Sequence, residues 1–202
     1  MIQCDARRRF LITLGALVCA APVRASDDEL ARLFAELGTR RERHARFAER
    51  KFSALLKAPI ESSGTMIFRS PDILERETIE PQRESVRIQG GVVTYEGAAV
   101  RGQTQKRSFA LTDAPLLAAL VESLRATLAG NLAELRRHYD VTKTGTGQAW
   151  GLTLVPRERA LRDAVERIEL RGKSSDVNEV EIVEANGDLT LLRIFPLPTP
   201  AK

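Results

Sequence analysis

Few residues of this sequence have the types and the spacing that catalysis requires. The only two histidines, His44 and His138, form no His-x-x-x-His motif and have no carboxylate cluster at metal-ligating spacing, so we expect structural or surface roles for both. No Gly-x-Ser-x-Gly motif is present, and Gly145-Thr146-Gly147 lacks the lysine and the spacing of a phosphate-binding loop. We therefore expect a hairpin turn at these glycines, and no enzymatic activity, metal or cofactor in this protein.

Paired carboxylates are the remaining candidates for acid and base chemistry. Glu75, Glu77 and Glu80 lie close together, but Arg76 and Arg83 are interleaved with them. Mixed charges at this spacing are typical of the solvated face of a strand pair, and we interpret them in that way.

The N-terminus has the order of a secretory signal. Three arginines, Arg7 to Arg9, precede an apolar run over residues 10–21, and small residues end the segment at Ala25. The run has about twelve residues, fewer than the roughly twenty that a membrane-spanning helix needs. We predict a signal over residues 1–25, by the general or the twin-arginine route, and a periplasmic location for a single domain over residues 26–202.

Both cysteines of the chain, Cys4 and Cys19, fall inside this signal. Cys19 follows Ala16-Leu17-Val18, which is similar to a lipoprotein attachment site except for the bulky Val18, and we expect no lipid there. The exported domain would then have no disulfide, and core burial must stabilise it. The signal holds a net charge of +3 of the formal +4, so the domain has about +1 and is not expected to bind nucleic acid.

Two amphipathic helices are predicted. Leu30, Leu33, Phe34 and Leu37 have helical spacing, and Gly38 suits the end of that helix. A longer helix is predicted over residues 113–129, with its N-cap at Thr112-Asp113, one leucine-rich stripe, and Glu122, Ser123 and Arg125 in water. A short helical turn is expected to follow from a new cap at Asn131.

Most of the other segments alternate apolar and polar residues, as strands do. The predicted strands cover residues 64–69, 73–80, 84–89, 92–96, 104–111, 150–155, 167–171, 177–184 and 189–195. Residues 40–56 are predicted as a long strand, with a helix as the alternative. Gly90-Gly91 and Asn186-Gly187 predict tight hairpins, and Pro196 is expected to end the last strand.

About eleven antiparallel strands tend to curl, so the predicted fold is mainly β with inserted helices (α+β): a half-open antiparallel barrel with a helical lid. Such a barrel encloses an apolar cavity. The residues predicted to line it are Phe47, Met66, Phe68, Val86, Ile88, Val93, Tyr95, Leu116, Leu120, Leu124, Trp150, Leu152 and Leu154.

Two segments carry a resemblance to a known family. Phe47-Ala48-Glu49-Arg50-Lys51 is followed by Gly-Thr-Met-Ile-Phe-Arg-Ser-Pro-Asp-Ile-Leu at residues 64–74, and this pattern resembles the LolA-like family of periplasmic outer-membrane lipoprotein carriers. The resemblance covers nearly the whole domain. It implies a monomeric half-barrel whose cavity shields the acyl chains of a lipoprotein or another lipid between an inner-membrane exporter and an outer-membrane acceptor protein.

The resemblance has one departure. In the carriers an arginine that ties the lid shut directly precedes the proline, whereas here Ser70 has that place. Arg69 lies one residue earlier and points to the other face of a regular strand, so it is only a possible lid contact. In this respect the sequence is more similar to the LolA-related proteins found beside lipid or pigment exporters. The alternative function is therefore a non-transporting adaptor that docks on such an exporter through the basic segment at residues 40–57.

The signal assignment makes a direct prediction. The exported protein should begin at Ser26, because Ala25 provides the small residue that signal cleavage requires. Intact-mass measurement of the protein from a periplasmic fraction tests this, and a diacylglyceryl-modified Cys19 as the first residue would contradict it.

Overall fold

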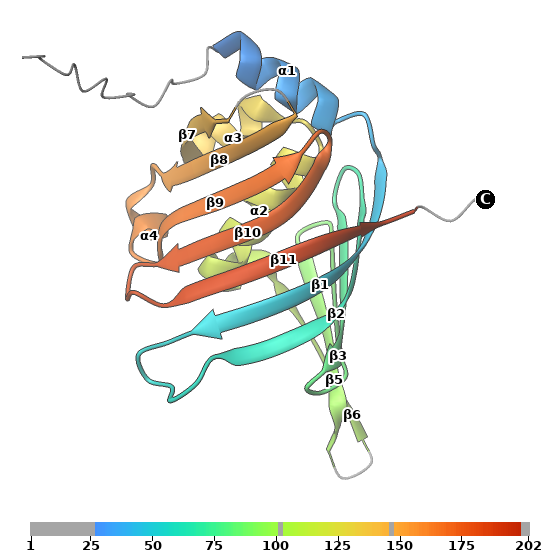
Figure 1. The fold of residues 1–202 in the computed structure, drawn as a ribbon. Coiled ribbons are helices and arrows are strands. Elements are labelled where there is room, and N and C mark those ends of the chain that lie inside the picture. Colours follow the sequence, from blue (N-terminus) through green and yellow to red (C-terminus); the bar gives the residue numbers. More distant parts are fainter. Residues whose placement is uncertain (1–26, 101–102, 146–147, 199–202) are drawn as a thin grey trace, which may run out of the picture.

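The structure of the chain is a computed structural model that describes residues 27–100, 103–145 and 148–198 (Figure 1). The predicted signal at residues 1–25, Cys19 included, lies outside the described residues. No helix among the described residues is long and apolar enough to cross a membrane.

The described strands form one antiparallel sheet of eleven strands in the order β6-β5-β4-β3-β2-β1-β11-β10-β9-β8-β7. The first six are β1 (Glu42–Phe52), β2 (Ile60–Arg69), β3 (Ile73–Glu80), β4 (Glu84–Gln89), β5 (Val92–Val100) and β6 (Gln103–Ala110). The others are β7 (Tyr139–Thr144), β8 (Ala149–Pro156), β9 (Val165–Lys173), β10 (Asp176–Glu184) and β11 (Leu189–Leu197). Because β6 and β7 do not pair, the sheet stays open, which confirms the predicted fold class.

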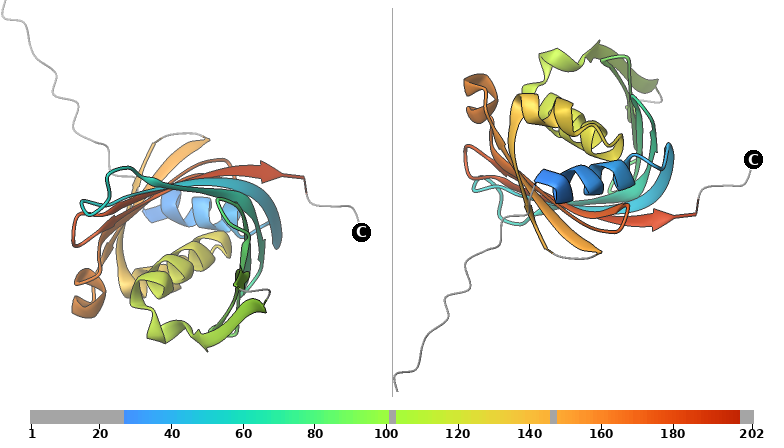
Figure 2. Two further views of the ribbon diagram at one scale, coloured as in Figure 1. Left: turned by 90° about the horizontal axis from the view of Figure 1, so that it is seen from below. Right: turned by 90° about the horizontal axis from the view of Figure 1, so that it is seen from above.

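Alternation along the strands gives the sheet one apolar face. Phe47 lies opposite Gly64 on β2 and Ile194 on β11, and the inward positions of neighbouring strands continue this row. The charged segment at residues 40–56 is therefore the strand that the sequence favoured, and the helix alternative was wrong. Figure 2 shows the sheet curling round the two longer helices, at residues 27–37 and 115–128, which lie in its concave side.

Five helical segments accompany the sheet: α1 (Asp27–Leu37), a 3-10 turn η1 (Leu111–Asp113), α2 (Pro115–Leu128), α3 (Leu132–His138) and α4 (Arg159–Arg162). Helix α1 was predicted from the helical spacing of four apolar residues, and it buries all four: Leu30, Leu33, Phe34 and Leu37. Asn131 caps α3 as expected, because its side chain accepts a hydrogen bond from the Glu134 amide. The segment η1-α2-α3 connects β6 to β7, the two edges of the sheet.

The predicted details of α2 need two corrections. Its N-cap is Ala114, without a side-chain hydrogen bond, because Thr112 and Asp113 belong to η1 and Pro115 starts the helix. Ser123, expected in water, is fully buried, and its hydroxyl donates to the carbonyl of Leu120. A helix inside a curled sheet and beside two other helices is covered on more than one side, which a single apolar stripe does not reveal.

Two elements were missed, and several strands were predicted too short; β2 was expected only from residue 64 and β5 only to residue 96. Strand β7 and helix α4 have no clear apolar period, so neither could be predicted. Strand β11 continues through Pro196 to Leu197, although Pro196 was expected to end it. Beyond Arg193, β11 pairs with β1 and no longer with β10, so this part of the strand has an edge where a missing N–H is tolerated.

The helices are tied to one another and to the sheet at a few close contacts. The C-terminal ends of α1 and α2 meet at Gly38 and Gly130, where a Cβ on Gly130 would lie 2.4 Å from the carbonyl oxygen of Phe34. Tyr139 at the start of β7 is buried and donates a hydrogen bond to the carbonyl of Ala119 in α2 at 3.0 Å. Burial raises the pKa of this hydroxyl, so it stays protonated and can donate.

The crossing of α1 and α2 can be tested with two glycines that share a backbone conformation. Gly130 and Gly187 have φ of +72° and +87°, but a Cβ on Gly187 would meet nothing within 4 Å. Gly187→Ala should therefore cost about 1–2 kcal/mol of unfolding free energy from backbone strain alone. Gly130→Ala should cost about 3 kcal/mol or more, because it adds a clash with α1. Chemical denaturation measures both, and equal losses would contradict the close crossing.

Candidate ligand-binding site

The residues predicted to line a cavity all lie on the concave face or on α2, but most of them are packed. Nine are buried: Phe47, Met66, Phe68, Ile88, Val93, Leu124, Trp150, Leu152 and Leu154. Val86, Tyr95, Leu116 and Leu120 are half-buried. All of these side chains except Tyr95 belong to one continuous apolar core with the helices. The concave interior is thus largely filled by α1 and α2 in this structure.

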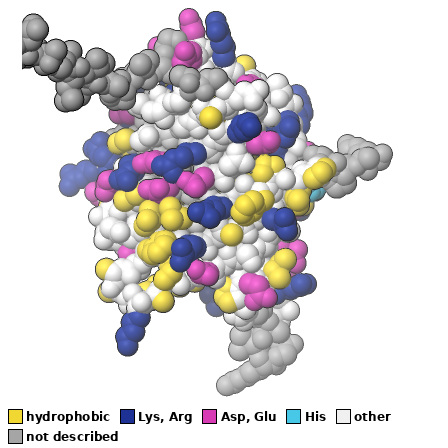
Figure 3. Space-filling view, viewed as in Figure 1, with side chains coloured by type: hydrophobic (Ala, Val, Ile, Leu, Met, Phe, Trp, Pro, Cys, Tyr) yellow, Lys and Arg dark blue, Asp and Glu magenta, His cyan; other side chains and the backbone are white. Residues whose placement is uncertain are grey.

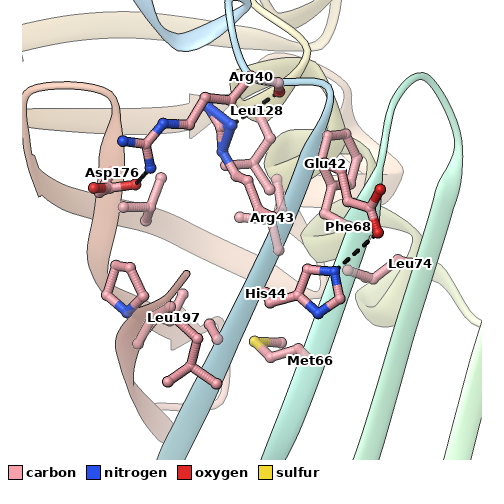
Figure 4. Close-up of a pocket in the computed structure, with 15 residues that line it drawn as sticks. Arg40, Glu42, Arg43, His44, Met66, Phe68, Leu74, Leu128, Asp176 and Leu197 are labelled. Atoms are coloured by element: carbon pink, nitrogen blue, oxygen red, sulfur yellow. Dashed lines mark hydrogen bonds and ion pairs between the residues drawn. The ribbon is translucent and has the colours of Figure 1, made fainter. Parts of the chain in front are cut away.

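One cleft opens from the surface into this interior (Figure 4). Its apolar part includes Met66, Phe68 and Leu74 from the sheet and Leu124 and Leu128 from α2. The room inside is about 60 Å³, enough for a few water molecules. Three of the predicted residues, Met66, Phe68 and Leu124, are therefore brought together at an opening, whereas Trp150 lies elsewhere and donates its indole N–H to the carbonyl of Ser174.

The mouth of the cleft lies where β10 and β11 diverge. Asp176 and Val177 at the start of β10 line one side, and Ile194, Pro196 and Leu197 at the end of β11 line the other. The two strands pair over Glu179–Val183 and Leu189–Arg193, and the lining residues lie beyond that pairing. The cleft is thus a gap between neighbouring strands of the sheet.

Two arginines border the mouth. Arg40 forms an ion pair with Asp176 at 2.8 Å and is half exposed. Arg43 points inward and donates to the carbonyls of Leu37, Arg40 and Ser175 at 2.5, 3.0 and 3.2 Å. Burial lowers the pKa of the Arg43 guanidinium from its ordinary value, with Asp176 opposing this effect. A guanidinium remains charged despite such a shift, so Arg43 places a cation beside apolar side chains.

A second polar group lines the cleft beside β2. His44 lies 2.9 Å from a carboxylate oxygen of Glu42, and Arg69 donates to the same oxygen at 3.1 Å. The hydrogen bond from His44, followed by that from Arg69, lowers the pKa of Glu42. Arg69 also pairs with Glu75 on β3. It was named as a possible lid contact that points to the other face of the strand, and it lies on the outer face, where it joins three strands.

The charged segment of β3 also differs from its interpretation. Glu75 lies on the outer face, where it pairs with Arg87 as well as Arg69. Arg76, however, lies on the concave face, where it donates to both oxygens of Glu49 at 2.7 and 3.1 Å and covers the ring of Phe47 at 4.2 Å. Strand alternation places Arg76 on the face opposite to its neighbours in the sequence. The expectation that it belongs to the solvated outer face was therefore wrong.

The sequence missed several residues of the cleft. Arg43, Leu74, Leu128, Val177 and Ile194 line it but were not among the predicted residues. Alternation with Phe47 places Arg43 on the inner face and could have identified it. The gap between β10 and β11 has no such signal, because it depends on where pairing between two distant segments stops.

The outer face offers a different surface. Figure 3 shows basic and acidic side chains interleaved over β9 and β10. Arg167 pairs with Glu169 at 2.9 Å, and Arg171 pairs with Glu169 and Glu179. Among the described residues, no three His, Cys, Asp or Glu side chains are grouped so that they could hold a metal ion. The apolar side chains of the cleft, in contrast, can contact apolar groups.

Solved structures that are similar to this chain match it only at low identity. A LolA superfamily protein from Nitrosomonas europaea is 10% identical, with a TM-score of 0.43, over 87% of this chain and 96% of that chain. In the MucA/MucB complex from Pseudomonas aeruginosa, the matched chain is 12% identical, with a TM-score of 0.46, over 86% of this chain and 58% of that chain. Comparison with curated proteins found no match.

The sequence itself gives a more direct assignment. The family model described as "Outer membrane lipoprotein carrier protein LolA-like" matches residues 20–194. The match spans most of the chain, from before α1 into β11. This protein therefore belongs to the LolA-like family of outer membrane lipoprotein carrier proteins.

Proposed function

We propose that this protein is a periplasmic carrier that holds the acyl chains of a lipoprotein or another lipid between its curled sheet and its helices. The observation that carries the proposal is the cleft, because it opens from the surface directly into the apolar interior. Each CH₂ group buried there would contribute about 0.8 kcal/mol, so a long chain gains much from leaving water. Membership of the LolA-like family supports the same function.

Binding of a full acyl chain requires the interior to open. The cleft offers about 60 Å³, whereas sites for ligands of ordinary size have about 300–1,000 Å³. Helix α2 is the element whose movement would provide that room, because Leu124 and Leu128 close the cleft from inside. Leu116 and Leu120 on the same helix are only half-buried, so they could exchange core contacts for contacts with a ligand at modest cost.

The adaptor alternative has less support. The basic segment at residues 40–57 was its expected docking surface, but β1 lies between β2 and β11 in the middle of the sheet. Arg50 pairs with Glu61, and Lys51 pairs with Glu184. Arg40 and Arg43 face the cleft. Four of the seven lysines and arginines of this segment are therefore engaged within the protein, and Arg41, Arg46 and Lys57 are the exposed cations that remain.

A dye assay separates the two functions. A carrier should bind an environment-sensitive apolar dye at a saturable site, and a long-chain fatty acid should displace the dye, because both would occupy the opened interior. Fluorescence titration of the purified protein measures this. A packed adaptor would show no saturation, and that result would contradict the carrier function.

The role of α2 makes a second prediction. Leu120→Glu should abolish dye binding, since a carboxylate facing the ligand has no partner and costs several kcal/mol to bury. The fold should lose less, because strand pairing does not pass through α2. Ala118→Glu, also half-buried on α2 but about 160° round the helix from Leu120, is the matched control and should retain binding. Thermal unfolding and dye binding are measured on the same samples, and loss of both in Leu120→Glu would contradict a movable α2.

A further inference from the structure

The gap between β10 and β11 is a break in an otherwise continuous sheet. Ile194 pairs with Phe47 on β1 but has no partner on β10, and Val177 pairs with Gly172 on β9 but has no partner on β11. Across the mouth, the hairpin before β10 is held by the exposed ion pair of Arg40 and Asp176 and by one hydrogen bond from Arg43 to the carbonyl of Ser175. Exposed ion pairs of this kind contribute little stability, so the mouth can widen without breaking strand pairs.

Arg43 has an unused hydrogen-bond donor at this gap. Its two terminal nitrogens donate to carbonyl oxygens, but its Nε is buried and has no acceptor among the described residues. Arg125 is the only other described residue with a buried side-chain nitrogen that has no hydrogen-bond acceptor, and it does not line the cleft. A buried donor without an acceptor is costly, and a ligand oxygen placed there would remove that cost.

We propose that the gap between β10 and β11 is a lateral binding site for one alkyl chain with an oxygen-bearing head group, a carboxylate or an ester, that accepts a hydrogen bond from Arg43. The proposal deepens the carrier function and rests on it. The chain would pass Ile194 and Leu197 and lie against Phe68 and Leu128. The cleft is narrow, which suits a single chain, and its cationic donor beside apolar side chains suits an acyl group better than an amine.

The path of the chain can be located with tryptophans on β11. Leu197 lines the mouth, whereas Phe195, on the same face of the strand and similarly exposed, does not. In a Trp150→Phe background, which removes the only native tryptophan, Leu197→Trp should be quenched saturably by a fatty acid brominated along its chain. Phe195→Trp should not be quenched. The lateral site would be overturned if both tryptophans were quenched equally, or if neither were quenched while the fatty acid still displaced the dye. Either result would leave the carrier function intact.

The head group is tested with ligands of one chain length. Arg43→Lys keeps the charge but removes Nε–H, so it should weaken binding of the fatty acid and of its methyl ester by about tenfold and leave binding of the corresponding alkane unchanged. Comparison of acid with ester distinguishes a free fatty acid from an acyl ester as the preferred ligand. The unchanged alkane also shows that the variant is folded.

Arg46→Lys is the matched control, because Arg46 lies on the same strand but faces the outer side beside Phe195. It should bind all three ligands as the unaltered protein does. An equal loss for acid, ester and alkane in Arg43→Lys would overturn head-group recognition, as would no loss at all. If no ligand binds the unaltered protein, the carrier function itself fails.

Discussion

An eleven-stranded sheet with one apolar face is unstable in water until that face is covered, and this requirement governs the rest of the structure. The described residues contain no cysteine, so burial must provide the stability that a disulfide would give elsewhere. Helices α1 and α2 cover the face from inside the curl. Their close approach depends on Gly38 and Gly130, and Arg43 satisfies the last carbonyl of α1 from the sheet. The guanidinium of Arg43 therefore holds the end of α1 against the sheet and also borders the cleft.

In the proposed carrier function, packing and ligand binding would compete for the same surface. Leu124 and Leu128 stabilise the protein without ligand by filling the space that a chain would enter. A ligand in that space replaces protein contacts with its own, so the net gain is smaller than the apolar area of the ligand alone suggests. Such compensation suits a protein that must release what it binds. An interior that was empty without ligand would lose stability for the same reason that cavities destabilise cores.

Local patterns in the sequence predicted most of the fold. Alternation identified the strands, and the Gly90-Gly91 and Asn186-Gly187 turns joined them as expected, since both depend on neighbouring residues only. Alternation with Phe47 would also have placed Arg43 on the concave face, and alternation with Leu74 would have placed Arg76 there. The cleft could not be predicted, because it exists where β10 and β11 stop pairing, and register between segments is set by the whole sheet. Ser123 was misplaced for a similar reason, as its burial depends on neighbours distant in the sequence.

The connection from β6 to β7 gives the helices a mechanical role. Strand β6 ends at Ala110 and β7 begins at Tyr139, so η1, α2 and α3 form the covalent strap between the two free edges of the sheet. Tyr139 reinforces the strap through its bond to Ala119. An outward shift of α2 must therefore pull on both edges, and the curvature of the sheet must follow. The space between α2 and the sheet is therefore coupled to the curvature of the sheet, because one covalent segment joins the helix to both edges.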